Sequence, residues 1–201
     1  APRSMKHPDW TGRTAVVIAN GPSLTREQID FAGESDVLAM TVNTAYQMAP
    51  WAPVFYAGDF LFHKVHNLRM RQHRMSSIWT TDSTAAEQYG VNRWKGRNDV
   101  GIGETMIHLN GNSGAQAINL AYLFGARKIV LLGFTMREID GKKHFHGDHE
   151  KPLVQKQLFG EWVHKMSFVA RDAKRLGVDI VNADPLSAMT CFRMGNLEAE
   201  L

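Results

Sequence analysis

Short apolar runs rich in β-branched residues alternate with helical patterns along most of the chain, and this alternation restricts the fold more than any other feature. The runs are short and nearly all apolar, as expected of strands that are covered on both faces. Such alternation predicts βαβ units that build a parallel sheet. The clearest predicted strands are residues 14–19, 36–42, 53–57, 76–81, 128–134 and 178–183.

Two helices between these runs have recognisable ends. In "SGAQAINLAYLFGA" we expect Ser113 to cap a helix and Gly125 to end it, and a longer helix should run from about Pro152 to Leu176 before Gly177. A chain of 201 residues with 44% hydrophobic residues is long enough for one full core. We therefore predict an α/β protein with a single Rossmann-like domain, 1–201, whose open, mostly parallel sheet of about six strands carries helices on both faces. Four tryptophans are expected in its core: Trp51, Trp79, Trp94 and Trp162.

The composition indicates a cytoplasmic protein with no membrane partner. No apolar run approaches the roughly 18 residues of a membrane helix, and the start "APRSMKHPDW" lacks the apolar core of a signal peptide. A lone cysteine, Cys191, cannot form an internal disulfide, which fits a reducing compartment.

One segment, His63 to Met75, is strongly basic. It contains Lys64, Arg69, Arg71 and Arg74 with three histidines and no acid. If it is helical, its basic face could attract phosphates or nucleic acid. A solvated helix face is the favoured interpretation, so nucleic acid is kept only as an alternative partner.

Polar loops follow several predicted strands, where an open α/β sheet binds its ligands. They are "NGPSL", "NTAY", "GDF" and "GFTM", while "NGNSG" opens a helix. Glycine lets a backbone approach a phosphate, and the first amides of a helix favour an anion. Either glycine loop alone also fits an ordinary turn or cap, but the pair at one sheet edge predicts a nucleotide site.

The motifs "VVIANGPSL", "VNTAY", "FYAGDF", "NGNSGAQAINLAYLFGARKIVLLGF", "HFHGDH" and "NADPLSAM" together carry a family resemblance. In order and spacing, the chain resembles the bacterial sialyltransferases, which begin with a strand and an NGPS loop. It is also similar to the wider superfamily of archaeal hydroxymethyl-dihydropterin diphosphokinases and flagellin-modification accessory proteins, and most of all to short phage-encoded members. For a phage protein, the implied location is the host cytoplasm. The likeness covers about Thr14 to Met189.

The resemblance implies a nucleotide or nucleotide-sugar donor and no required cofactor. Asn20 and Ser23 would contact a nucleotide phosphate or sugar, and Asn43 would touch the nucleotide or the donor sugar. The N-S-G helix start would hold the cytidine-side ribose or phosphate, and the late Pro-x-Ser loop would close over the base. The implied nucleotide-binding residues are Asn20, Gly21, Pro22, Ser23, Asn43, Asp59, Asn112, Ser113, Gly114, Pro185 and Ser187.

The histidine cluster has three interpretations. The resemblance implies a general base, for which His149 is the nearest counterpart, Asp148 falls almost equally well, and His146 completes the catalytic set. Alternatively, His144 and His146 share one side of an extended segment and bind Zn²⁺ or Mn²⁺ together with Asp148 or His149. The third interpretation is a polar loop that hydrogen-bonds its own turn around Gly147.

Some positions depart from the sialyltransferase pattern. Phe134, Thr135 and Met136 stand where that family has tyrosines near the leaving phosphate, and Thr135 replaces an acid. The first hypothesis is a glycosyltransferase-like transferase with a nucleotide-activated donor. One alternative is a metal-dependent diphospho- or phosphotransferase that uses Mg²⁺, Mn²⁺ or Zn²⁺ at Asp59 and Asp148, although Asp59 is equally well explained as a helix cap. The other is a non-catalytic accessory protein that binds a nucleotide or associates with nucleic acid. The acceptor is not identified, and a homo-oligomer or partner subunit could complete the site.

Overall fold

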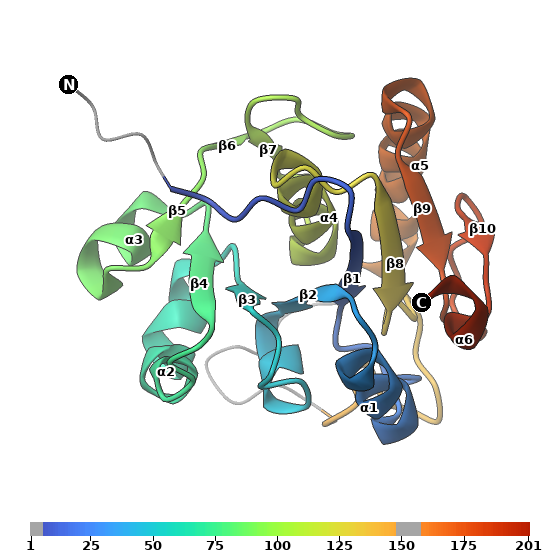
Figure 1. Cartoon of the computed structure of the whole chain (residues 1–201), viewed down its shortest axis with the longest axis horizontal. Helices are drawn as coiled ribbons and strands as arrows, with labels where there is room; N and C mark the ends of the chain where they lie inside the picture. Colours follow the sequence, from blue (N-terminus) through green and yellow to red (C-terminus); the bar gives the residue numbers. More distant parts are fainter. Residues whose placement is uncertain (1–5, 148–157) are drawn as a thin grey trace.

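A parallel β-sheet forms the centre of the protein in the computed structural model, which describes residues 6–147 and 158–201. Its strands are β1 (Thr14–Ile18), β2 (Leu38–Val42), β3 (Val54–Tyr56), β4 (Ser77–Thr80), β5 (Asn92–Arg93), β8 (Lys128–Leu132), β9 (Asp179–Asn182) and β10 (Arg193–Met194). They pair in the order β10-β9-β8-β1-β2-β3-β4-β5, and each neighbouring pair is parallel (Figure 1). A separate pair, β6 (Gly96–Arg97) with β7 (Ile107–His108), lies outside this sheet. The predicted α/β class with a parallel sheet is confirmed.

Helices cover both faces of the sheet, as predicted. Their bounds are α1 (Arg26–Glu34), the 3₁₀ helix η1 (Asn43–Gln47), α2 (Phe60–Arg71), α3 (Ser83–Tyr89), α4 (Ser113–Leu123), α5 (Phe159–Leu176) and α6 (Leu197–Glu200). In Figure 1, α4 and α5 lie on one side of the sheet and α1 and α2 on the other.

Strand β1 shows why the predicted strands are almost wholly apolar. Ala15 and Val17 belong to the core under α4 and α5, whereas Val16 and Ile18 belong to the core under α1 and α2. All four side chains are fully buried, because successive residues of a strand point to opposite faces and both faces are covered.

The expected tryptophan core is only half right. Trp79 is buried, and Trp94 packs against the same core. Trp51 is 38% exposed, with its ring lying over Gly33 of α1. Trp162 belongs to neither core cluster, since the first turns of α5 extend past the sheet's packed centre toward its carboxyl edge.

Two helix ends differ from the sequence expectation. The cap of α4 is Asn112, not Ser113, because the Asn112 Oδ1 accepts a hydrogen bond from the Ala115 amide at 2.8 Å. The predicted stop is confirmed, since α4 ends just before Gly125, which has a φ of +107°. Helix α5 begins at Phe159, after the non-helical Leu158, and it ends at Leu176 before Gly177, as predicted. Residues 152–157 of the expected helix lie outside the described residues.

The connectivity produces a switch point in the middle of the sheet. From β1 the chain builds strands outward to β5, and it returns through β7 and α4 to place β8 on the other side of β1 (Figure 1). The loops after β1 and β8 therefore lead to opposite sides, and such a point opens a crevice at the carboxyl ends of the strands.

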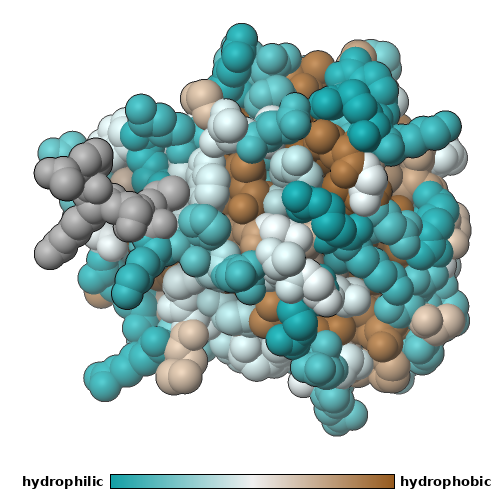
Figure 2. All heavy atoms as spheres, turned by 45° about the horizontal axis from the view of Figure 1, so that its top comes forward, coloured by the Kyte–Doolittle hydropathy of each residue, from teal (hydrophilic) through white to brown (hydrophobic). Residues whose placement is uncertain are grey.

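The outer surface is mainly polar where Figure 2 displays it, with small apolar patches between hydrophilic side chains. Within residues 6–147 and 158–201, no helix is long and apolar enough to cross a membrane.

Candidate functional site

A cleft of about 200 Å³ lies at the switch point, at the carboxyl ends of β1, β2 and β8. Loops after four strands, the start of α4, the histidine loop and the first turn of α5 form its walls. Its lining includes Asn20, Gly21, Asn43, Asp59, Asn112, Ser113 and Gly114 from the predicted nucleotide-binding set, together with Gly111, Phe134, Thr135, Met136, Lys143, His144, Phe159 and Trp162. Seven residues predicted from four separate loops thus line one cavity.

The backbone around this cleft adopts uncommon conformations. Asn43, directly after β2, has a φ of 50°, and Met136, in the loop after β8, has a φ of 54°. Few residues other than glycine occupy this left-handed region, and such residues concentrate at functional sites. The backbone therefore turns sharply at these two positions, in the loops that follow β2 and β8 and line the cavity.

The start of α4 offers several hydrogen-bond donors to the cleft. The amides of Ser113 and Gly114 make no hydrogen bond with any described residue, as is usual for the first turn of a helix. The Asn112 side chain is only 9% exposed, and its Nδ2 likewise has no partner within the described part of the chain. A buried donor without a partner costs free energy, so this amide is suited to a ligand acceptor.

Two lysines lie at or beside the cleft, and each is ion-paired with a glutamate. The Lys165 Nζ lies 2.8 Å from the position a Cβ would take at Gly111, immediately before α4, and forms an ion pair with Glu161 at 2.8 Å. Lys143 lines the cleft and lies 3.7 Å from the Glu138 carboxylate. The positive end of the α4 dipole, with the Lys165 ammonium group against Gly111, makes the start of α4 suitable for an anion.

Gly21 is required by packing between two of the cleft loops. Its amide donates to the Gly133 carbonyl oxygen at 2.8 Å, and a Cβ at Gly21 would overlap that oxygen and the Thr135 Oγ1. The glycine therefore lets the loops after β1 and β8 pass each other at the switch point.

Four residues of the predicted set do not line the cleft: Pro22, Ser23, Pro185 and Ser187. Ser23 Oγ donates to the Asp184 carboxylate, and Thr135 Oγ1 donates to the same carboxylate at 2.9 Å. Ser187 Oγ donates to the Phe134 carbonyl oxygen at 2.6 Å. Because Asp184 is only 1% exposed, these hydrogen bonds join the loops after β1, β8 and β9 beneath the cleft surface.

The described part of the histidine loop is a turn, as the polar-loop interpretation expected, and not the extended segment of the metal interpretation. The Gly147 amide donates to the His144 carbonyl oxygen at 3.1 Å, and the His144 and His146 rings stack with centroids 5.2 Å apart. The His146 Nε2 lies 2.8 Å from the Thr44 Oγ1, which accepts from the Asn20 Nδ2 at 3.1 Å. His144 lines the cleft, whereas His146 is linked to the NGPSL loop through Thr44.

The other members of the cluster, Asp148 and His149, lie outside the described residues. Over residues 6–147 and 158–201, no group of three or more His, Cys, Asp or Glu side chains could hold a metal ion. The general base at His149 and the metal set of His144, His146 and His149 therefore stay predictions.

Asp59 fits both interpretations made from the sequence. It lines the cleft, and its Oδ1 accepts a hydrogen bond from the Leu61 amide at 3.2 Å as the cap of α2.

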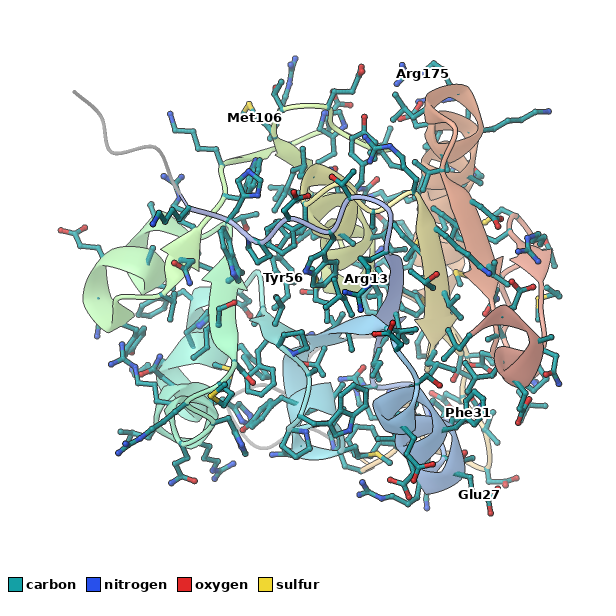
Figure 3. All side chains as sticks on the ribbon, viewed as in Figure 1. Arg13, Glu27, Phe31, Tyr56, Met106 and Arg175 are labelled. Atoms are coloured by element: carbon teal, nitrogen blue, oxygen red, sulfur yellow. The ribbon has the colours of Figure 1, made fainter. Side chains whose placement is uncertain are left out.

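Nearby, His63 is fully buried, with its Nε2 2.8 Å from the Ala57 carbonyl oxygen, and burial lowers the pKa of this imidazole. Burial also raises the pKa of Tyr56, whose hydroxyl donates to Gln116 of α4 near the centre of the molecule (Figure 3). Both groups are thus neutral near pH 7.

The basic segment is partly helical, as the sequence suggested, but two of its three histidines do not belong to the basic face. His63 and His66 are buried, and four cationic side chains remain exposed: Lys64, Arg69, Arg71 and Arg74. A solvated basic surface agrees with the favoured interpretation.

Sequence analysis missed the contribution of α5 and of Lys143. Phe159 and Trp162 line the cleft, and Lys165 lies one turn further along α5 against the start of α4. The sequence pattern of residues 159–176 indicates an amphipathic helix, but it does not indicate which loop the start of that helix packs against. The spacing of Trp162 and Lys165, three apart, is the only local hint that they share a face.

Comparison of the sequence with protein-family models gives no match, and comparison with curated proteins gives none. Functional inference therefore rests on the geometry and chemistry of the cleft.

Proposed function

We propose that the protein is a transferase that binds a nucleotide-activated donor in this cleft, a glycosyltransferase of the sialyltransferase-like type. The observation that carries the proposal is the buried Asn112 side-chain amide, which has no partner among the described residues, beside first-turn amides of α4 that likewise have none there, at the switch point of a parallel sheet. These donors and Lys165 suit a phosphate, while the apolar side chains of the lining, among them Phe134 and Trp162, suit a base or sugar ring.

The proposed reaction is a substitution at the donor sugar. A hydroxyl of the acceptor attacks the sugar carbon, the bond from that carbon to the phosphate oxygen breaks, and the nucleotide leaves with the bonding electrons. The proton of the hydroxyl passes to His149, the base that the resemblance implies. The start of α4 would stabilise the charge on the departing phosphate, which is typically a large share of catalysis by preorganised sites.

The decisive variant is Asn112→Asp. Aspartate caps a helix as well as asparagine does, so α4 should keep its stability. The same change replaces the Nδ2 donor with a carboxylate oxygen and adds negative charge to the anion site. We expect binding of the preferred nucleotide among CMP, UMP, GMP and AMP to weaken at least about tenfold, because a hydrogen bond to a charged group contributes roughly 1.5–3 kcal/mol.

Binding can be followed by thermal shift and calorimetry, since a ligand at 100 times its Kd adds roughly 2.7 kcal/mol of stability. The matched control is Asn196→Asp, the same substitution at the cap of α6, where Oδ1 accepts from the Ala199 amide at 3.3 Å. Equal nucleotide affinity in the wild type and Asn112→Asp would contradict the proposal, as would the absence of binding by every nucleotide and nucleotide sugar.

The position of Asp59 in the cleft favours a second candidate, a metal-dependent phosphotransferase. Asn can replace Asp as a cap, so Asp59→Asn should leave α2 intact while removing a carboxylate ligand for Mg²⁺. If turnover of ATP requires Mg²⁺ or Mn²⁺ and Asp59→Asn abolishes it, the second candidate replaces the first. Nucleotide binding that is independent of divalent metal and of Asp59 supports the first.

A further inference from the structure

Four phenylalanine and tryptophan rings line the cleft, and they differ in how deeply they are buried. Phe62 and Phe134 are 4% and 1% exposed. The Phe62 ring is already stacked on His66, with centroids 4.3 Å apart and planes 11° apart. Phe159 and Trp162, on the first turn of α5, are half-buried instead.

Trp162 is held in place without being part of the core. It belongs to neither core cluster, and the Phe159 and Trp162 rings lie nearly perpendicular, with 5.7 Å between centroids and 85° between planes. A partly exposed indole at the wall of the cleft leaves apolar area in contact with water, and covering that area with a ligand ring is favourable.

The indole also lies at a useful place relative to the anion end of the cleft. Trp162 precedes Lys165 by three residues on α5, or about 4.5 Å along the helix axis. Lys165 lies against Gly111 at the start of α4, where the phosphate is proposed to bind. One helix therefore carries an aromatic ring in the cleft lining and, one turn later, a cation against the start of α4, in the order in which a nucleotide carries its base and its phosphate.

We propose that Trp162 is the stacking platform for the base of the bound nucleotide, with the phosphate at the start of α4. This inference rests on the proposed function and assigns to it a residue that binds the base. Stacking uses the face that every base has, so Trp162 would contribute affinity for the base, and hydrogen bonds elsewhere would choose among bases.

The test compares Trp162→Ala with Trp162→Phe by calorimetry, using two probes. The first is whichever of CMP, UMP, GMP and AMP binds the wild type most tightly, and the second is ribose 5-phosphate, which lacks the base. Trp162→Ala should weaken nucleotide binding about 5- to 150-fold, since base stacking is worth roughly 1–3 kcal/mol. Ribose 5-phosphate binding should be unchanged, and Trp162→Phe should recover most of the nucleotide affinity.

Tryptophan fluorescence supplies an independent readout. Nucleotide should quench the wild type and Trp51→Phe, a control at an exposed ring outside the cleft lining, but should not quench Trp162→Phe. Equal weakening of both probes by Trp162→Ala, or undiminished nucleotide affinity, would overturn stacking and leave the proposed function standing. Loss of affinity confined to nucleotide sugars would assign the ring to the sugar and also overturn it. If the wild type binds no nucleotide, both proposals fail together.

Discussion

At the scale of single residues, Gly21 shows how a binding-loop motif can be fixed by packing alone. The sequence suggested a glycine that lets a phosphate approach the backbone. In the structure, the space that a side chain would need is already filled by Thr135 and by the Gly133 carbonyl group. The close approach of the loops after β1 and β8 is therefore sufficient to require a glycine in the NGPSL loop.

Gly21→Ala should therefore lower the free energy of unfolding by about 1–3 kcal/mol, the usual cost of overpacking, and urea denaturation would measure it. Gly160→Ala is the control, because Gly160 lies within α5 and no described atom is within 4 Å of its Cβ position. That change should stabilise the protein by up to about 1 kcal/mol, since alanine favours the helix. Similar effects of the two variants would show that the packing at Gly21 is not tight.

At the scale of elements, α4 was predicted well, except for the identity of its cap. Asn112 and Ser113 are both good caps, so the sequence alone does not choose between them. The backbone does choose: Asn112 is extended, with φ of −153° and ψ of 146°, and Ser113 is the first helical residue. This shift by one residue leaves the Ser113 hydroxyl without a role as a cap.

Because Asn112 and not Ser113 caps α4, substitutions at these two adjacent positions should affect stability and nucleotide binding differently. Asn112→Ala should destabilise the protein by about 1 kcal/mol through loss of the cap. Ser113→Ala should change stability by less than about 0.5 kcal/mol, because the hydroxyl caps nothing. If Ser113 contacts the nucleotide, its variant should weaken binding in calorimetry while thermal unfolding of the free protein stays unchanged. A larger loss of stability for Ser113→Ala than for Asn112→Ala would contradict the assigned cap.

Helix α5 marks the limit of element-level prediction. Its end at Gly177 follows from the glycine, which adopts a φ of +70°. Its contribution to the cleft depends on where the crossing of α5 places Trp162 and Lys165 relative to α4. The position of these two side chains relative to α4 is set by packing between elements far apart in sequence, so helical periodicity cannot predict it.

At the scale of the whole molecule, the parallel sheet was predictable because burial on both faces gives its central strands an unmistakable apolar composition. The loops could then be grouped because parallel strands end at the same edge of the sheet, and Asn20, Asn43 and Asp59 do line one cleft. Edge strands β5 and β10 were missed, since two residues carry no periodic signal. The order of strands, and with it the switch point, depends on long-range pairing that no local motif specifies.

The far edge of the sheet is held by an ionic network with a predictable pH dependence. Arg193 of β10 donates to Asp179 of β9 at 2.8 Å and to Glu200 of α6 at 2.6 Å, and Lys128 of β8 lies 3.0 Å from Glu200. The hydrogen bond from Arg193, followed by that from Lys128, lowers the pKa of Glu200 from 4.5 to about 2. The hydrogen bond from Arg193 likewise lowers the pKa of Asp179.

Because these folded-state pKa values lie below the unfolded ones, the network stabilises the protein fully above about pH 4.5 and progressively less as pH falls toward 2. Arg193→Met should lower the urea midpoint at pH 7, and the difference from the wild type should shrink as pH falls through this window. Arg13→Met is the control, because Asp36, its partner at 2.8 Å, has a side chain 98% exposed and such surface pairs contribute little. A difference for Arg193→Met that is the same at pH 7 and near pH 2 would mean that packing of the arginine stem, and not its ion pairs, joins β10 and α6 to the sheet.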